Sequence, residues 1–326
     1  MPRCFHQPLP PLAALLWLTL VQPSVIVAVE TGQVIARQNV EEGYIAVTGG
    51  KVWYRIIGVN KPGIPLLALH GGPGATSDPL EMLAPLADER PLVLYDQLGS
   101  GRSDVPTDNS LYRVERYVEE LAQVRAALGL KHVHLLGHSW GTMLAVDYIL
   151  TNPSGIESLV LAGPALSAQR WADDQKAYLA QMPQSVRDVV VRNEAAGTFS
   201  STEYLAAVDA YYHQQLLRMD VWPQVMKRGA FGDAVYQFMW GPSEFTFSGT
   251  LKSYDRVDRL SELHLPVLFT CGEFDEATPA TTAFYQGKVP GAKLRVFAGA
   301  SHMTYVEQPE AYTAAVRAFI HSVEKR

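Results

Sequence analysis

The chain has 326 residues, a formal net charge of −6 and 48% hydrophobic residues. This length accommodates one large α/β domain with an insertion, or two domains, around a sizeable core. The net charge is acidic and Lys and Arg form no run, which argues against nucleic acid as a partner.

Cysteine content argues against both a disulfide framework and a metal site. The chain holds only Cys4 and Cys271, and neither stands in a Cys/His spacing typical of metal ligands. Cys271 ends a predicted strand, so we expect a buried apolar side chain there. We expect neither a metal nor another cofactor.

Residues 1–28 have the pattern of a secretory signal peptide. A weakly basic start precedes the apolar run 12–21, and Ala28 suits the end of a cleavage site. A membrane anchor and a start site assigned too early are the alternatives. Pro23 interrupts the apolar run, so we expect no stable membrane span. Cleavage implies a secreted or periplasmic protein, and an intact segment implies a cytoplasmic one.

From about residue 42 onward, short apolar runs alternate with helical patterns. A β-hairpin signal around Gly49 and Gly50 comes first. Alternating strands and helices predict a mostly parallel sheet with helices on both faces. The predicted strands are 43–47, 51–57, 65–69, 92–95, 132–136, 159–161, 266–270 and 294–297, and the predicted helices are 79–86, 114–128, 142–148, 279–286 and 309–323.

The alternation stops between residues 166 and 251, where the chain is rich in Gln, Tyr, Met, Trp and Arg and has a helical pattern. Sheet strands return at residue 266, which favours an insertion over a separate second domain. We therefore predict an α/β core of residues 42–165 and 252–326, with a helical cap of residues 166–251. Ligands of α/β sheets bind at the carboxyl ends of the strands, where this cap would cover them.

Residues 137–141 read GHSWG and stand between a predicted strand and a predicted helix. This is the context of a nucleophile elbow, in which a sharp turn raises the Ser139 hydroxyl above the sheet edge. Gly137 and Gly141 leave room for the turn. The N-terminus of the helix then directs the Trp140 N–H toward an anion beside Ser139. His138 is expected to be structural.

A serine hydroxyl needs a base and a carboxylate that orients the base. His302 follows the last predicted strand and is the candidate base. Three acids follow the preceding strand, namely Glu273, Asp275 and Glu276. We favour Asp275, and the chain order serine, acid, histidine is that of the α/β-hydrolase fold.

The sequence HGGPG at residues 70–74 follows the third predicted strand. A tetrahedral intermediate carries an oxyanion that is stabilised by two backbone donors. We expect Trp140 to supply one N–H and the glycine-rich loop, at Gly72, to supply the other. A plain tight turn is the alternative interpretation of this loop.

Five motifs together resemble the prolyl aminopeptidase (proline iminopeptidase) family of α/β-hydrolases. The resemblance covers the chain from about Gly43 to the C-terminus. It rests most specifically on the glycine-rich loop combined with the insertion motif. The motifs are HGGPG at 70–74, DQLGSGRS at 96–103, GHSWG at 137–141, GPSEF at 241–245 and GEFDEATP at 272–279.

This resemblance implies a serine hydrolase that releases an N-terminal residue, proline or another small or apolar one, through an acyl-enzyme. The implied substrates are short peptides, amino-acid amides and arylamides. In that family, acidic residues hold the ammonium group of the substrate, and the resemblance places Glu244 and Glu276 at their positions. It also places Tyr236 at the position of a tyrosine that helps to hold this group. The alternatives are a solvated loop acid at Glu244 and a helix N-terminal charge at Glu276.

Two other functions are compatible with the same residues. An esterase or lactonase using this triad would hydrolyse esters without a free amine and would be indifferent to Glu244→Gln. A ligand-binding receptor on the same fold would bind without turnover, although the complete triad argues against it. The sequence leaves the preferred first residue and the oligomeric state open.

Overall fold

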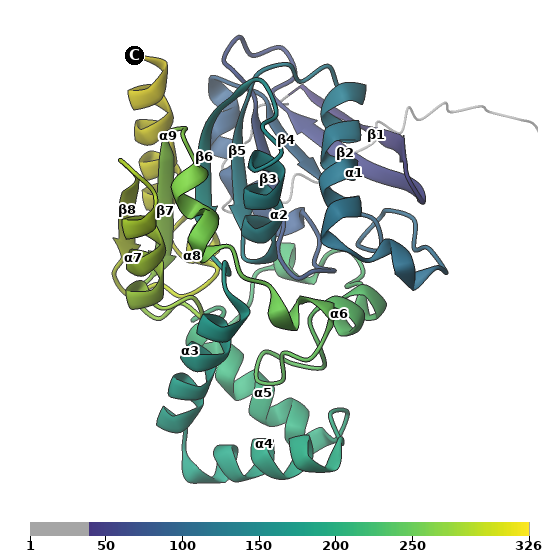
Figure 1. Cartoon of the computed structure of the whole chain (residues 1–326), viewed down its shortest axis with the longest axis vertical. Helices are drawn as coiled ribbons and strands as arrows, with labels where there is room; N and C mark the ends of the chain where they lie inside the picture. The colour runs from purple at the N-terminus through teal and green to yellow at the C-terminus, as the bar shows by residue number, and fades with distance from the viewer. Residues whose placement is uncertain (1–38, 326) are drawn as a thin grey trace, which may run out of the picture. The chain divides into compact units, whose positions relative to one another are not determined.

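A computed structural model describes residues 39–325, which form one eight-stranded sheet with helices (Figure 1). The order across the sheet is β1-β2-β4-β3-β5-β6-β7-β8. The strands are β1 (Val40–Val47), β2 (Gly50–Ile57), β3 (Leu66–Leu69), β4 (Leu92–Tyr95), β5 (Val133–His138), β6 (Ile156–Ala162), β7 (Val267–Gly272) and β8 (Lys293–Phe297).

The sheet is antiparallel at one edge and parallel elsewhere. Strand β2 runs antiparallel to both β1 and β4, and every pairing from β4 through to β8 is parallel. The predicted hairpin is present, with Thr48 and Gly49 in the turn and Gly50 as the first residue of β2. The predicted fold class, a mostly parallel α/β sheet of the α/β-hydrolase type, is confirmed.

The helices follow the predicted positions with two differences. Residues 79–86 were expected to be helical, but residues Asp78–Asp88 form the 3-10 helix η1, with Pro85 and its missing N–H inside it. The short α8 was not expected. The α-helices are α1 (Val114–Ala127), α2 (Trp140–Ile149), α3 (Ala168–Gln181), α4 (Gln184–Ala196), α5 (Thr202–Gln215), α6 (Asp233–Met239), α7 (Pro279–Lys288), α8 (Thr304–Glu307) and α9 (Pro309–Glu324).

The central strands bury both faces, and alternate residues pack into two different clusters. In β3, Leu67 and Leu69 join the cluster under α1, α2 and α7, whereas Leu66 and Ala68 join the cluster under η1 and α9. This alternation follows from the two-residue period of a strand. Burial on both faces explains the continuous apolar runs seen in the sequence.

Helices α3 to α6 lie between β6 and β7 and gather at the carboxyl ends of the parallel strands (Figure 1). The segment leaves and rejoins the sheet at neighbouring points, where Ser167 pairs with Asp255 in an isolated bridge. The Ala168 N–H also donates to the Tyr254 carbonyl oxygen at 2.8 Å.

No helix among residues 39–325 combines the length and the apolar character needed to cross a membrane. The predicted signal peptide lies outside the described residues, as does Cys4. Cys271 is buried at the end of β7, as expected, and burial raises the pKa of its thiol to about 12.

Two glycines allow β5 and α2 to approach closely at the Ser139 turn. A Cβ on Gly137 would lie 2.2 Å from the Gly141 carbonyl oxygen, and a Cβ on Gly141 would lie 2.5 Å from the Leu69 carbonyl oxygen. Both contacts are with backbone atoms, which have little freedom to move. The expected need for glycine on either side of Ser139 is therefore confirmed.

We predict that Gly137→Ala destabilises the protein by about 3 kcal/mol or more, because the added methyl group forces strand and helix apart. Urea unfolding followed by circular dichroism measures this change. Gly287→Ala in α7 is the matched control, since its Cβ would meet no described atom within 4 Å. The control should be neutral or slightly stabilising. Equal stability of Gly137→Ala and wild type would contradict the packing argument.

Candidate active site

Ser139 stands between β5 and α2 in a strained backbone conformation. Its φ is 55° and its ψ is −122°, an unusual combination for a residue with a side chain. The Ser139 N–H donates to the Ala162 carbonyl oxygen at 2.9 Å, and its carbonyl oxygen accepts from Thr142 N at 2.8 Å. The surrounding backbone therefore holds the strained turn in place, as is common at functional sites.

His302 is bonded to Asp275 within the buried interior. Its Nδ1 lies 2.6 Å from Asp275 Oδ1, and both side chains are at most 3% exposed. Asp275 also accepts from the backbone N–H groups of Ala277 at 2.9 Å and Gly272 at 3.1 Å. The carboxylate is thus fixed on three sides, and it directs the other ring nitrogen, Nε2, away from itself.

The structure separates the three acids that follow β7. Glu273 is exposed and accepts from the Gly299 N–H at 2.8 Å. Asp275 contacts His302 Nδ1, and Glu276 Oε2 lies 3.7 Å from His302 Nε2. Only Asp275 therefore occupies the position of an orienting carboxylate.

His138 and Gly163 hold the His302 ring and its backbone. His138 Nε2 lies 3.1 Å from the His302 carbonyl oxygen, and the two rings are 4.5 Å apart between centroids. Burial lowers the pKa of His138 well below its usual range, so its ring is neutral and Nε2 can donate. A Cβ on Gly163 would lie 2.6 Å from His302 ring atoms, so only glycine fits against this face.

The glycine-rich loop packs against Ser139. A Cβ on Gly71 would lie 3.0 Å from Ser139 Cβ, and Gly72 has a φ of +108°, which favours glycine. Within the described part of the chain, no hydrogen bond engages the N–H groups of Gly72 and Trp140. Both donors are therefore free beside Ser139.

Gln97, in the segment after β4, makes hydrogen bonds that hold the glycine-rich loop in place. Gln97 N–H donates to His70 Nε2 at 2.9 Å, and the Gln97 amide donates to the His70 carbonyl oxygen at 3.1 Å. Gln97 Oε1 accepts from Trp140 Nε1 at 2.8 Å. One glutamine thus ties the glycine-rich loop to the first residue of α2.

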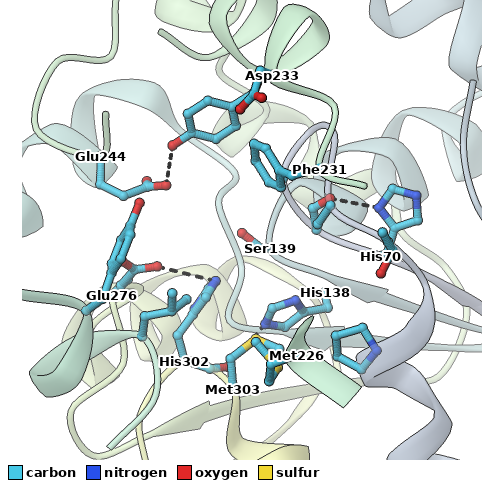
Figure 2. A pocket seen from close by; sticks show the side chains of 18 of the residues that line it. His70, His138, Ser139, Met226, Phe231, Asp233, Glu244, Glu276, His302 and Met303 are labelled. Atoms are coloured by element: carbon cyan, nitrogen blue, oxygen red, sulfur yellow. Dashed lines mark hydrogen bonds and ion pairs between the residues drawn. The ribbon is translucent and has the colours of Figure 1, made fainter. Parts of the chain in front are cut away.

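Glu244 and Glu276 approach the same cavity from different segments. Glu244 follows α6, and Tyr236 Oη donates to its Oε1 at 2.6 Å. Ser243 Oγ accepts from the N–H groups of Phe245 and Thr246, each at 3.2 Å, which holds the turn that presents Glu244. Figure 2 shows Glu244 and Glu276 on the same side of Ser139.

Two carboxylate oxygens at this position are buried without partners. Glu244 Oε2 and Glu276 Oε1 accept no hydrogen bond from any described residue. A buried oxygen of this kind costs free energy unless a donor or a cation occupies the space beside it. Glu276 also lies before the N-cap Thr278 of α7 and faces His302 instead of the helix.

The charges of these groups are strongly linked. Burial is the largest single effect on the His302 pKa and lowers it, but Asp275, Glu276 and Glu244 together outweigh burial and raise this pKa to about 9. Burial raises the pKa of Glu276 well above its usual range, and the charge of Glu244 raises it further. Burial also raises the pKa of Glu244, against the hydrogen bond from Tyr236.

A cavity of about 630 Å³ joins these groups and is large enough for a small peptide or arylamide. Ser139, His302, Glu244 and Glu276 all line it. The insertion adds apolar walls from Phe199, Leu205, Trp222, Met226 and Phe231. In residues 39–325, no three His, Cys, Asp or Glu side chains are grouped as a metal site.

The sequence interpretation missed three residues that support the site. Gly163 follows the end of β6, a position at which a functional residue is expected. Gln175 in α3 donates to the Glu276 carbonyl oxygen at 2.9 Å, and the Gln215 carbonyl oxygen in α5 accepts from His302 N–H at 3.0 Å. No local pattern marks these two glutamines.

Comparison with known proteins agrees with this geometry. The α/β hydrolase fold family matches residues 64–309. Proline iminopeptidase of Heyndrickxia coagulans is 46% identical, with 86% of this chain and 99% of the relative covered. The crystal structure of proline iminopeptidase from Mycobacterium smegmatis has a TM-score of 0.78 at 33% identity, with 87% of this chain and 98% of that chain covered.

We predict that Asp275→Asn lowers the His302 pKa from about 9 toward or below the ordinary value near 6.5, because burial then acts with less opposition. NMR titration of the His302 ring measures the pKa. Glu273→Gln removes an exposed charge from the same loop and should leave it unchanged. A His302 pKa that stays near 9 in Asp275→Asn would refute the assigned electrostatics.

Proposed function

The chain belongs to the proline iminopeptidase family of α/β-hydrolases, and we propose that it is a serine aminopeptidase that releases N-terminal proline from short peptides, amides and arylamides. The observation that carries this proposal is the pair of buried, unpartnered carboxylate oxygens of Glu244 and Glu276 in the cavity of Ser139. A protonated amine supplies the charge and the donors that these oxygens lack.

In the proposed reaction, His302 Nε2 accepts the proton of the Ser139 hydroxyl as the oxygen attacks the scissile carbonyl carbon. Asp275 holds the ring by its bond to Nδ1 and stabilises the imidazolium that forms. His302 then donates the proton to the departing amine, which leaves a prolyl ester on Ser139. Water attacks this ester with His302 as base, and proline leaves.

We assign the oxyanion hole to the N–H groups of Gly72 and Trp140. Support comes from the close packing of the glycine-rich loop on Ser139 and from the position of Trp140 at the start of α2. Two such donors stabilise charge that forms only in the transition state. The bonds of Gln97 to both segments keep the donors in place.

We assign residues 166–251 to a cap that selects the substrate. This segment contributes Glu244 and Tyr236, whereas Glu276 comes from the loop after β7. Burial raises the pKa of Tyr236 well above its usual range, so the phenol stays protonated and donates to Glu244. Glu244 Oε1 is thereby directed by the cap, and Oε2 is left for the substrate ammonium group.

We predict cleavage of proline arylamide by the wild type and little cleavage of the N-acetylated compound or of a simple acyl ester. Steady-state kinetics with the chain from about Val29 onward measure the three rates. Glu244→Gln should raise KM for proline arylamide about 10- to 100-fold, because a charge-assisted hydrogen bond contributes about 1.5–3 kcal/mol.

Ser139→Ala is the control for chemistry, and it should abolish all three activities. Glu203→Gln, an exposed acid in α5, controls for charge loss in the insertion and should leave KM unchanged. Comparable rates on the acetylated compound and the ester, with no effect of Glu244→Gln, would replace this proposal with an esterase.

A further inference from the structure

Glu276 has one carboxylate oxygen near the His302 ring and one that no described residue engages. Its Oε2 lies 3.7 Å from His302 Nε2, and a dashed line marks this pair in Figure 2. Its Oε1 is buried without a partner. Nε2 is the only ring nitrogen left for Ser139, because Asp275 occupies Nδ1. Glu276 therefore lies beside the ring nitrogen available to Ser139 and, in the proposed function, beside the substrate ammonium group.

The side chains that face His302 are mostly carboxyl groups. The loop after β7 contributes Asp275 and Glu276, and the insertion contributes Glu244. From the end of β5 comes His138, whose neutral ring adds no positive charge. The Trp171 ring from α3 packs edge-on at 5.8 Å between centroids. Without substrate, this surrounding stabilises a proton on His302.

We propose that an ammonium group bound between Glu244 and Glu276 releases the proton from His302 Nε2, so that small protonated amines activate this enzyme as well as being recognised by it. The proposal rests on the ammonium role assigned above. It adds a second role for Glu276, which touches the reacting nitrogen of the base.

The physical reason is competition between two cations for one carboxylate. A protonated His302 and a bound ammonium group would each contact Glu276 from opposite oxygens, in a buried space where like charges repel strongly. The repulsion is relieved when Nε2–H⁺ transfers its proton to solvent. Nε2 then carries the lone pair that accepts the Ser139 proton.

The electrostatics of His302 agree with this sequence of events. The His302 pKa of about 9 leaves most of the base protonated at neutral pH. By thermodynamic reciprocity, an ammonium group that lowers this pKa binds more weakly when His302 is protonated. A substrate without an amine leaves the base in its protonated, inactive form.

The test is hydrolysis of 4-nitrophenyl acetate by the full-length protein between pH 6 and 10, with and without pyrrolidinium chloride. The acetyl group is too small to fill the ammonium site. Without pyrrolidinium, the rate should rise through pH 9. With pyrrolidinium, the midpoint should fall, and the rate at pH 7 should increase about tenfold or more. Tetrahydrofuran, an uncharged ring of the same size, and NaCl at equal ionic strength are the controls.

Glu276→Gln gives changes of opposite sign on two substrates. It removes the charge beside Nε2, so ester hydrolysis at pH 7 should increase severalfold without pyrrolidinium and should no longer respond to it. Proline arylamide should show a raised KM in the same variant. A merely damaged fold would lower both activities. Glu273→Gln removes an exposed acid from the same loop and should behave as wild type on both substrates.

The outcomes separate this inference from the function on which it rests. If Glu276→Gln leaves KM for proline arylamide unchanged, the ammonium role itself is wrong. If KM rises but pyrrolidinium inhibits or does not affect the ester, the activation is overturned alone. Should ester turnover be too slow to follow, NMR titration of His302 decides the question. A pKa that falls with pyrrolidinium supports the proposal, and an unchanged pKa overturns it.

Discussion

Two carboxylates buried in one cavity impose the constraint on which the rest of this site depends. Among residues 39–325, Glu244 and Glu276 each have one oxygen without a hydrogen-bond partner, and burial disfavours the charge on both. Hydrogen bonds nevertheless hold both residues in place, from Tyr236 to the Glu244 carboxylate and from Gln175 to the Glu276 carbonyl oxygen. In the proposed function these carboxylates make the cavity selective, since an uncharged substrate would gain nothing from them and an ammonium group would gain two charge-assisted bonds.

The sheet and the insertion both contribute residues to the cavity that holds Glu244 and Glu276. The sheet supplies Ser139, Asp275 and His302 from the ends of β5, β7 and β8, where parallel strands finish at one edge. The insertion supplies Glu244 and is also hydrogen-bonded to the loops that follow the sheet strands. Gln175 donates to the Glu276 carbonyl oxygen, and the His302 N–H donates to the Gln215 carbonyl oxygen. Movement of the insertion would therefore displace Glu244, Glu276 and His302 together, and with them both recognition and catalysis in the proposed function.

Sequence reasoning reached the parts of the site that follow from local rules. Strand ends and chain order predict Ser139 and His302 as nucleophile and base, an assignment that stays a prediction, and the two glycines around Ser139 follow from the geometry of the turn. The three acids after β7 were harder to separate, because only the folded loop shows that Asp275 meets Nδ1. Glu244 was reached through family resemblance, since nothing local distinguishes it from a surface acid.

The supporting residues were beyond sequence reasoning for a physical reason. Gln175 and Gln215 act through contacts between the insertion and distant loops, and tertiary packing alone brings these segments together. The 3-10 geometry of η1 likewise reflects Pro85 and packing against the sheet, which an apolar period does not reveal.

Binding of two boronic acids tests the central claim most directly, because a boronate forms a tetrahedral adduct with an active serine. Pyrrolidine-2-boronic acid carries the ring ammonium group, and cyclopentylboronic acid has the same shape without it. We expect pyrrolidine-2-boronic acid to inhibit the wild type at least about tenfold more tightly than cyclopentylboronic acid, an advantage of about 1.4 kcal/mol. This advantage should be lost in the double variant Glu244→Gln, Glu276→Gln. Equal inhibition of the wild type by the two compounds would contradict the central claim.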